Sequence, residues 1–562
     1  MKKLLAFSLV LSLVLTFGIA NVGQAQDNQA PSDIMREQVY GGTIHLARTQ
    51  APEGMFNPLF HQGTYDADIA ALVFEGLTTV DNQFRPKPEL AVDWEVSNDN
   101  KTYTFYLDED AKFHDGHPVT AEDVKYTFKM FLHPDYTGVR TSDFTPILGA
   151  EAYSNGNADD VKGIKVIDDH TIEITTSEVF APFLSVTCGY GIVPKHILGD
   201  TKPANLSKLD FNQNPIGSGP FEFVEYKTDQ FAKLKAYEDY REGRPFLDNV
   251  VIHYINAQTL VMQLEKGEVD WGQIRGTNFN RVNKMDHISL HQQIRNGFGY
   301  IAFNTREENF PVNLPHVRRA IAYGVNRTGF QKEVMNGMAN NVNSPISQAS
   351  WAYTDDLNQY PYNPEKAKQI LKDNGWEMKD GVWHKDGKPL SFTLTGSSGN
   401  KFINQLLAMS QNNLNNIGMD VKLQKLEFNS MREKINNGEL KSWFMAWTLG
   451  ADPDPYSMFH TEGSWNRTGW GSEETDKIIE KARTTLDQRK REKLYEDFQK
   501  KWNKTMPYLP MYANIYAHAV NKRIRNYDPR PGAMNPFHSW DVLTEVWIPK
   551  DERRQTQTQS NN

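Results

Sequence analysis

The sequence predicts a multi-domain α/β fold, and three observations lead to that prediction. The chain has 562 residues, more than a single hydrophobic core accommodates, so two or three domains are expected. Apolar and polar residues alternate at 103–107 and on both sides of Asp168 within 165–174, which is typical of strands and of a hairpin. A strand, a helix and a second strand follow one another at 390–426.

The segment 390–426 is the most regular part of the sequence. "LSFTLT" alternates as a strand does, apolar residues at helical spacing follow, and Gly418 ends that helix before "MDVKLQKLEF" alternates again. Short links between two strands and a helix predict a right-handed parallel crossover. We therefore expect an α/β domain over about 301–512, whereas 76–213 is richer in hairpin patterns.

A helix predicted at 363–375 has clear start and stop residues. Asn363 is a good N-cap, Pro364 suits the first helical position, and Gly375 suits the end of the helix. These three residues place a helix within the predicted α/β domain, ahead of its crossover unit.

The first residues of the chain have the pattern of an export signal. Lys2 and Lys3 precede an apolar run that extends to about Ala20, and small residues follow up to Ala25. We expect cleavage near Ala25; an uncleaved anchor is the alternative, because the run is just long enough to span a bilayer. Residues 26–38 are predicted to form a flexible leader.

Composition narrows the compartment and the class of protein. The formal net charge is −9 and no basic stripe is present, which argues against a nucleic-acid partner. Cys188 is the single cysteine, so an internal disulfide and a thiolate-rich zinc site are excluded, and no cysteine near the cleavage point can carry a lipid. These features predict an exported protein of a bacterial periplasm, with a disordered tail at 551–562.

The stretch "FHDGHPVTAEDV" raises the question of a metal or acid/base site, because His114, Asp115 and His117 lie within four positions. A zinc pair on a helix needs histidines four residues apart, and these two are three apart. Gly116 and Pro118 also disfavour a helix and favour a turn. We therefore predict a turn and no metal, and a metal cluster remains the alternative.

The same stretch continues into a predicted helix, with Thr120 as N-cap and Asp123 completing a capping box. "IGSGP" at 216–220 has the glycine content of a phosphate loop but not its lysine or its spacing, so a tight backbone connection is expected there. No G-x-S-x-G and no H-E-x-x-H occurs. The sequence therefore predicts neither an enzyme nor a cofactor.

Segment 108–124, "DEDAKFHDGHPVTAEDV", resembles the signature of the family 5 extracellular solute-binding proteins, which are the peptide, dipeptide and nickel receptors of ABC importers. Several further blocks match that family in its order, and together they are more specific than any one block. They are "GGTIHLA" with "FNPLF" in 41–60, "NPIGSGPFEF" at 214–223, "YIAFNTREENFPVNLPHVRRAIAYGVNR" at 300–327 and "AWTLGADPDPYSMFHTEG" at 446–463.

The resemblance implies a two-lobed periplasmic binding protein of type II, in its large three-domain variant, with a ligand cleft between the lobes. Two crossover segments, near 296–304 and 508–516, would join the lobes. The expected parts are a signal peptide at 1–25, a leader at 26–38, a lobe I core from 39–75, 214–298 and 515–550, a lobe I subdomain at 76–213, lobe II at 301–512 and the tail at 551–562.

The resemblance also implies a ligand site in the Asp-Pro loop of lobe II. In peptide receptors of this family an aspartate of this loop takes the α-ammonium group of the ligand, and the matching residue here is Asp452 or Asp454, of which we favour Asp452. A carboxylate in a closed cleft gains more from a cation than it would in water. The alternative is an Asp-Pro turn without a functional role.

Five further residues are expected at the cleft from the same resemblance, with ordinary packing as the alternative for each. Aromatic side chains there would cover apolar ligand surface without requiring one side-chain identity. The five are Trp447, Tyr65, Phe303, Asn304 and Asn466.

The function implied by the resemblance is capture of an oligopeptide or dipeptide by lobe closure and its delivery to an ABC transporter permease, by a monomer. Other cargo carried by relatives stays open: a nickel chelate, glutathione, a sugar or a cell-wall peptide. A secreted metal-dependent hydrolase that uses His114, Asp115 and His117 is the alternative from another class.

Overall fold

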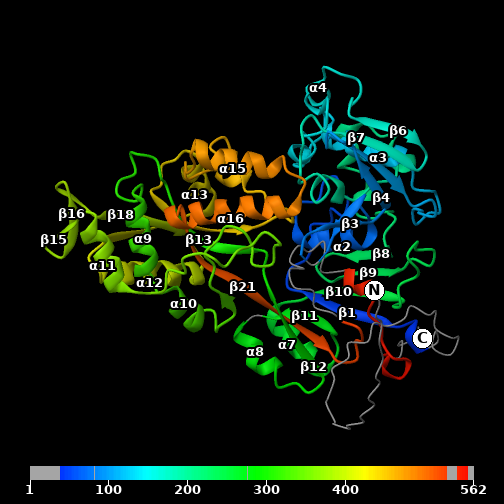
Figure 1. The fold of residues 1–562 in the computed structure, drawn as a ribbon. Helices are drawn as coiled ribbons and strands as arrows, with labels where there is room; N and C mark the ends of the chain where they lie inside the picture. Colours follow the sequence, from blue (N-terminus) through cyan, green and yellow to red (C-terminus); the bar gives the residue numbers. More distant parts are fainter. Residues whose placement is uncertain (1–37, 82, 275, 528–540, 555–562) are drawn as a thin grey trace, which may run out of the picture.

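One large sheet runs through both ends of the molecule (Figure 1). The computed structural model describes residues 38–554 except 82, 275 and 528–540. The sheet has twelve strands in the order β19-β18-β20-β13-β21-β11-β1-β10-β9-β8, and β12 and β14 also pair with β21. Their bounds are β1 (Thr43–Arg48), β8 (Phe221–Lys227), β9 (Phe231–Ala236), β10 (Asn249–Tyr254), β11 (Trp271–Ile274), β12 (Ile288–Ile294), β13 (Gly297–Phe303), β14 (Ala339–Asn340), β18 (Ser391–Ser397), β19 (Asp420–Leu426), β20 (Ser442–Thr448) and β21 (Tyr508–Asn521).

Strand β21 joins the two ends of this sheet. Its first residues pair with β13, and its last residues pair with β11 and β12. We call the end with β1 and β8–β12 lobe I, and the end with β13, β18, β19 and β20 lobe II. The chain therefore passes between the lobes within β21 and between β12 and β13, and these are the places where a hinge would act. The domain boundaries expected from the sequence stay a prediction.

Lobe II confirms the predicted crossover. Strands β18 and β19 are parallel neighbours, and α12 (Lys401–Asn415) connects them. Helix α11 (Pro364–Asp373) begins where the sequence predicts, because the Asn363 side chain accepts a hydrogen bond from the backbone N–H of Lys366. The other elements of this lobe are α9 (Pro315–Gly324), α10 (Arg327–Glu333), β15 (Glu377–Lys379), β16 (Val382–Lys385), β17 (Lys388–Pro389), α13 (Phe428–Asn436), α14 (Tyr456–Phe459), α15 (Glu473–Arg483) and α16 (Gln488–Thr505).

Two arginines of the block at 300–327, Arg318 and Arg327, are buried inside lobe II without a carboxylate partner among the described residues. Arg318 donates to the backbone carbonyls of Thr505, Met506, Val312 and Asn313. Burial lowers the pKa of Arg318 to about 9. Its guanidinium thus donates to carbonyl groups at the end of α16, where the last carbonyls of a helix have no N–H donor within the helix.

A four-stranded antiparallel sheet, in the order β4-β5-β7-β6, forms a separate layer beyond lobe I. We call residues 76–213 the subdomain. The predicted hairpin at 165–174 is confirmed by β6 and β7, and the predicted strand at 103–107 by β5. The bounds are β2 (Thr78–Val80), β3 (Pro86–Pro88), β4 (Ala91–Val96), β5 (Thr102–Leu107), α3 (Ala121–Leu132), η1 (Thr141–Asp143), α4 (Ala150–Ser154), β6 (Ile164–Asp168), β7 (Thr171–Thr175), η2 (Thr187–Gly189), α5 (Lys195–Leu198), α6 (Pro203–Leu206) and η3 (Asp210–Asn212).

The remaining elements belong to lobe I, and one hydrophobic core continues from lobe I into the subdomain. Two further clusters fill lobe II. Burial of each large apolar side chain in these cores contributes about 1.5–3 kcal/mol to the free energy of unfolding. The lobe I helices are α2 (Thr64–Val73), α7 (Ala257–Lys266), α8 (Gly276–Val282), η4 (Asp541–Thr544) and η5 (Lys550–Glu552).

The "HDGHP" stretch forms the predicted turn, and Gly116 has a φ of 86°. The His114 ring lies against the "IGSGP" segment: its Nε2 is 2.9 Å from the carbonyl oxygen of Gly219, and its Nδ1 accepts from the N–H of Gly217 at 3.3 Å. Burial lowers the pKa of His114 to about 4. A Cβ on Gly217 would lie 2.0 Å from the carbonyl oxygen of Val73. Both motifs therefore hold backbone segments together at the end of α2.

The helix after this turn begins with the predicted capping box. Asp123 accepts from the backbone N–H and the hydroxyl of Thr120, both at 2.9 Å. Such a cap contributes about 1 kcal/mol to helix stability.

The structure corrects part of the predicted disordered tail. Residues 551–554 pack on lobe I, because Arg553 donates to the carbonyls of Ile548 and Gln38, and Arg554 pairs with buried Asp270 at 2.8 Å. The polar composition of 551–562 predicts disorder, whereas the guanidinium groups of Arg553 and Arg554 have partners as far away in sequence as Gln38 and Asp270. The rest of the tail, the signal peptide and most of the leader lie outside the described residues.

Candidate ligand-binding site

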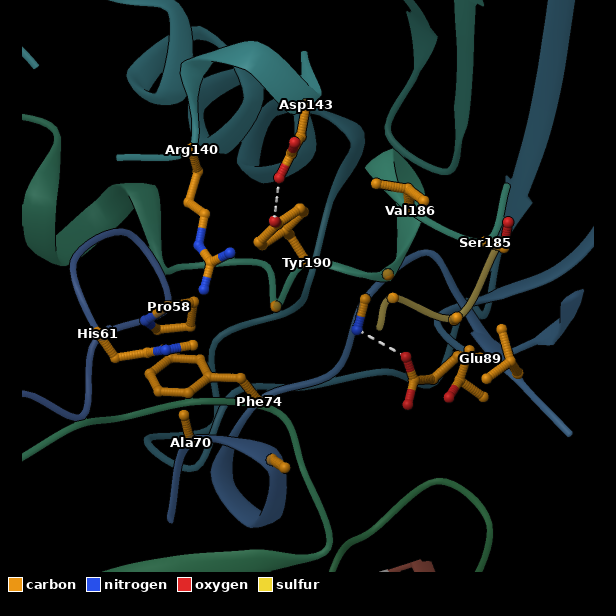
Figure 2. Close-up of a pocket in the computed structure, with 18 residues that line it drawn as sticks. Pro58, His61, Ala70, Phe74, Glu89, Arg140, Asp143, Ser185, Val186 and Tyr190 are labelled. Atoms are coloured by element: carbon orange, nitrogen blue, oxygen red, sulfur yellow. Dashed lines mark hydrogen bonds between the residues drawn. The ribbon is translucent and has the colours of Figure 1, made fainter. Parts of the chain in front are cut away.

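A cavity of about 350 Å³ lies where the subdomain and α2 meet the Asp-Pro loop of lobe II. Its walls come from residues within 58–80, 140–143 and 185–191 and from Glu89 on one side, and from Gly450 and Ala451 on the other. Figure 2 shows the side chains that line it. The volume lies in the range of sites for small ligands.

Arg140 carries a positive charge into this cavity. Figure 2 shows its side chain extending between Tyr190 and the pair formed by Pro58 and His61. The guanidinium carbon lies 5.8 Å from the centre of the Tyr190 ring. Within the described ranges no hydrogen bond or ion pair of the guanidinium is found, and its Nε is buried without a hydrogen-bond partner. A cation in this position is available to a ligand.

His61 beside Arg140 stays neutral. Burial, followed by the nearby charge of Arg140, lowers its pKa to about 3. At neutral pH Arg140 is therefore positively charged and His61 is not.

The two carboxylates on the cavity wall already have partners. Asp143 accepts a hydrogen bond from the hydroxyl of Tyr190, and Glu89 accepts from the backbone N–H of Gly76 at 2.7 Å; both bonds are drawn in Figure 2. Burial, followed by the charge of Asp143, raises the pKa of Tyr190, so its proton stays in place. These bonds hold the carboxylates in the wall.

Asp452 is buried at the boundary between lobe II and the subdomain, and its side chain is 4% exposed. Arg491 of α16 binds it with two bonds, Nη2 to Oδ1 at 2.8 Å and Nη1 to Oδ2 at 3.1 Å. The hydroxyl of Ser185, from the subdomain, donates to Oδ2 at 3.2 Å. The role of Asp452 as ammonium partner stays a prediction, and a ligand in that position would compete with Arg491.

Asp454 lies beside it and pairs with Arg483 of α15, with Nε and Oδ2 3.0 Å apart. Its Oδ1 accepts from the backbone N–H of Tyr456 at 3.0 Å. Burial raises the pKa of Asp454 to about 6, although Arg483 acts in the opposite direction. Asp452 and Asp454 line a second, smaller hollow of about 40 Å³ that shares Gly450 and Ala451 with the cavity.

Segment 180–185 of the subdomain contacts lobe II directly. The N–H of Ala181 donates to the carbonyl of Arg483 at 2.7 Å, and the Arg483 guanidinium lies 5.2 Å from the centre of the Phe180 ring. With the bond between Ser185 and Asp452, these contacts join the two sides of the cavity. Figure 1 shows the end of α15 next to the subdomain. The structure therefore has its lobes in contact.

Two predicted aromatic residues are half-buried. Trp447 lies on β20, with its ring parallel to that of Tyr300 at 6.2 Å and edge-on to Trp465 at 5.8 Å. Tyr65 lies in the first turn of α2. Neither lines the cavity described above, and their contact with a ligand stays a prediction.

Three other predicted residues are buried in lobe II and serve its packing. Phe303 and Asn304 are fully buried, and Asn304 donates to the carbonyls of Gly438 and Leu440. Asn466 donates to the carbonyls of His460 and Trp470. In this conformation Phe303 and Asn304 have no surface toward a ligand, and a direct contact by any of the three stays a prediction.

Sequence reasoning missed Arg140, the cavity residue best suited to bind a charged group of a ligand. It follows "HPDYTG" in an irregular segment, and no motif marks it.

The comparisons agree with this fold. The profile of the bacterial extracellular solute-binding proteins, family 5 (middle region), matches residues 85–470. The chain belongs to this family.

Among its relatives is the oligopeptide-binding protein AppA of Bacillus subtilis, 29% identical over 94% of this chain and 97% of AppA. Another is heme-binding protein A of Haemophilus influenzae, 27% identical over 96% of this chain and 98% of that protein. The solved structure of Bacillus subtilis AppA with a nonapeptide covers 91% of this chain and 100% of that chain, at a TM-score of 0.72 and 29% identity. The predicted two-lobed fold class of type II periplasmic binding proteins is confirmed.

Among the described residues, no helix combines the length and the apolar character needed to cross a bilayer. The predicted signal segment was not part of that search, because it lies outside them.

Proposed function

We propose that this protein is the peptide-binding receptor of an ABC importer. The observation that carries the proposal is the cavity between lobe II and the subdomain, which the Arg140 guanidinium faces without an ion pair among the described residues. Membership of the solute-binding family and the similarity to a protein named for oligopeptide binding support it.

A peptide held in this cavity would contact both sides at once. Such a ligand binds the closed form better than the open form, and this difference in affinity drives closure. The contacts of segment 180–185 with Arg483 and Asp452 then complete the closed state. Main-chain groups of a peptide offer hydrogen bonds that do not depend on its side chains, which allows a broad choice of sequence.

Arg140 is the partner we assign to a carboxylate of the ligand. A guanidinium without an internal partner gains a charge-assisted, two-pronged interaction when a carboxylate enters. The C-terminal carboxylate is the one that every unmodified peptide has. Asp452 remains the candidate for the ligand's ammonium group, on the condition that Arg491 yields part of its interaction.

The remaining elements of the proposal follow from this function. We propose export to the periplasm with cleavage near Ala25, delivery of the ligand to membrane permease subunits, a monomeric state and no catalytic step. The family's extracellular character and the N-terminal signal pattern support export.

Native mass spectrometry of protein purified without refolding tests the cargo, because a closed receptor retains what it binds. We expect peptides to be released on activation, and calorimetry with a peptide mixture to give dissociation constants of about 1 μM or lower, near −8 kcal/mol. Released haem or a metal chelate, with no heat from any peptide, would contradict the proposal.

A further inference from the structure

The geometry points to a site for a divalent transition metal ion, with zinc as the best-fitting class, on the outer surface of the subdomain. Its ligands are Asp115, His117 and His196, which come from the "HDGHP" turn and from helix α5. None of the three lines the ligand cavity, so the site is independent of the proposed peptide binding.

The three side chains are already gathered around a common point. His196 Nε2 lies 2.7 Å from Asp115 Oδ2, and His117 Nδ1 lies 3.2 Å from Asp115 Oδ1. One ligand atom from each residue can be chosen so that all three lie within 4.8 Å of one another. Tetrahedral zinc with bonds of about 2.0–2.1 Å places its ligand atoms about 3.3 Å apart, so the three side chains would rotate toward the ion from separations of up to 4.8 Å.

The backbone that holds these side chains is fixed. The N–H of Phe113 donates to the carbonyl of His117 at 2.8 Å, which closes the turn. Helix α5 is tied to the start of α3, because the N–H of Lys195 donates to Asp123 at 2.9 Å. The His196 ring packs 5.5 Å from the ring of fully buried Phe113. The two segments are therefore positioned by the core and not by the metal.

The ligand set differs from the one considered in the sequence. His114 is committed to Gly217 and Gly219 and cannot turn outward without losing both bonds. His196, 81 positions after Asp115, takes its place. Two imidazoles and one carboxylate suit zinc and its first-row neighbours better than calcium or magnesium.

The site would act on stability and not on hydrolysis. The side chains of Asp115, His117 and His196 are 26%, 59% and 28% exposed, so a fourth position is open to water. A bound ion links the turn to α5 and stabilises the folded subdomain by mass action. The hydrolase alternative needs His114 as a ligand or base, and the bonds of His114 leave it unsuited to that role.

Calorimetric titration of Zn²⁺ into the full-length protein, purified without a histidine tag and treated with chelator, tests the site. We expect one equivalent to bind with a dissociation constant below 100 μM and to raise the melting temperature. His117→Gln and His196→Gln should each weaken binding at least tenfold, whereas His170→Gln, a control in the same subdomain, should not change it. Co²⁺ should give the visible absorption of a nitrogen- and oxygen-bound ion in the wild type and lose it in both variants.

No saturable binding below 1 mM, or equal affinity in wild type and both variants, would overturn the site. The melting temperatures of the metal-free variants and of the metal-free wild type are compared first, which separates loss of a ligand from loss of folding. Peptide binding should persist in both variants, so failure of the metal site leaves the proposed function untouched. Failure of peptide binding would likewise leave the metal site untouched.

Discussion

The charged side chains of the Asp-Pro loop of lobe II and those of the opposite cavity wall differ in whether they form ion pairs. In the loop, Asp452 and Asp454 are each paired with an arginine of their own lobe. On the subdomain side, Arg140 faces the cavity without an ion pair in the described part of the chain. The charges of the Asp-Pro motif are thus already paired within the protein, while a loop without a recognisable motif supplies the charge that is available to a ligand.

This difference adds a second charge to the expected site. The sequence predicts a carboxylate of lobe II that binds the ligand's ammonium group, and we propose in addition that the Arg140 guanidinium binds the ligand's carboxylate. Breaking a buried ion pair leaves an uncompensated charge and is costly, so the pair of Asp452 and Arg491 resists capture by a ligand.

The largest effect is expected from Arg491→Met. This change leaves the Asp452 carboxylate buried without its partner and should lower the free energy of unfolding by about 3–5 kcal/mol. Urea denaturation followed by tryptophan fluorescence measures this, with Lys490→Met on the exposed face of α16 as the matched control. Adding Asp452→Asn to Arg491→Met should restore much of the loss; no recovery would show that the two side chains do not act as a pair.

A pH dependence should arise from Asp454. Its folded pKa of about 6 lies above the ordinary value of 3.8, so between these values the folded state binds more protons than the unfolded state. Stability from this group is therefore complete below pH 4 and is lost as pH rises through 6, by up to about 3 kcal/mol. Urea denaturation from pH 4 to 7 should show this slope in the wild type and a flatter one in Asp454→Asn. Equal slopes would mean that another group titrates.

The smallest effect is expected from Ser185→Ala, which removes the hydroxyl that reaches across to Asp452. Loss of one such bond should disfavour the closed form by about 1 kcal/mol and weaken ligand affinity about fivefold. Calorimetry with the best peptide measures the change, and Ser177→Ala, on an exposed serine of the same subdomain, serves as the control. If both alanine variants bind alike, the contact between the two sides does not contribute to closure.

The parts of the fold that depend on local sequence were predictable. The capping box of Thr120 and Asp123 and the helix start at Asn363 need residues only three positions apart. The crossover of β18, α12 and β19 follows from periodicity. Such features appear directly in the order of residues.

The parts that depend on distant pairing were not predictable. Asp452 meets Arg491 after 39 positions, and Asp115 meets His196 after 81. Arg140 matters because its guanidinium has no ion pair within the part of the chain that the structure describes, a property that no sequence pattern expresses. For the same reason the packing of Arg553 and Arg554 on lobe I was missed.

The most direct test of the account is a calorimetric cycle with one bound peptide, its C-terminally amidated form, the wild type and Arg140→Gln, with Arg281→Gln as a surface control. We predict that amidation weakens binding to the wild type and to Arg281→Gln at least tenfold, about 1.4 kcal/mol. Arg140→Gln should bind both peptides with similar, weaker affinity. Equal loss on amidation in the wild type and in Arg140→Gln would contradict the assignment of Arg140 as the partner of the ligand's carboxylate.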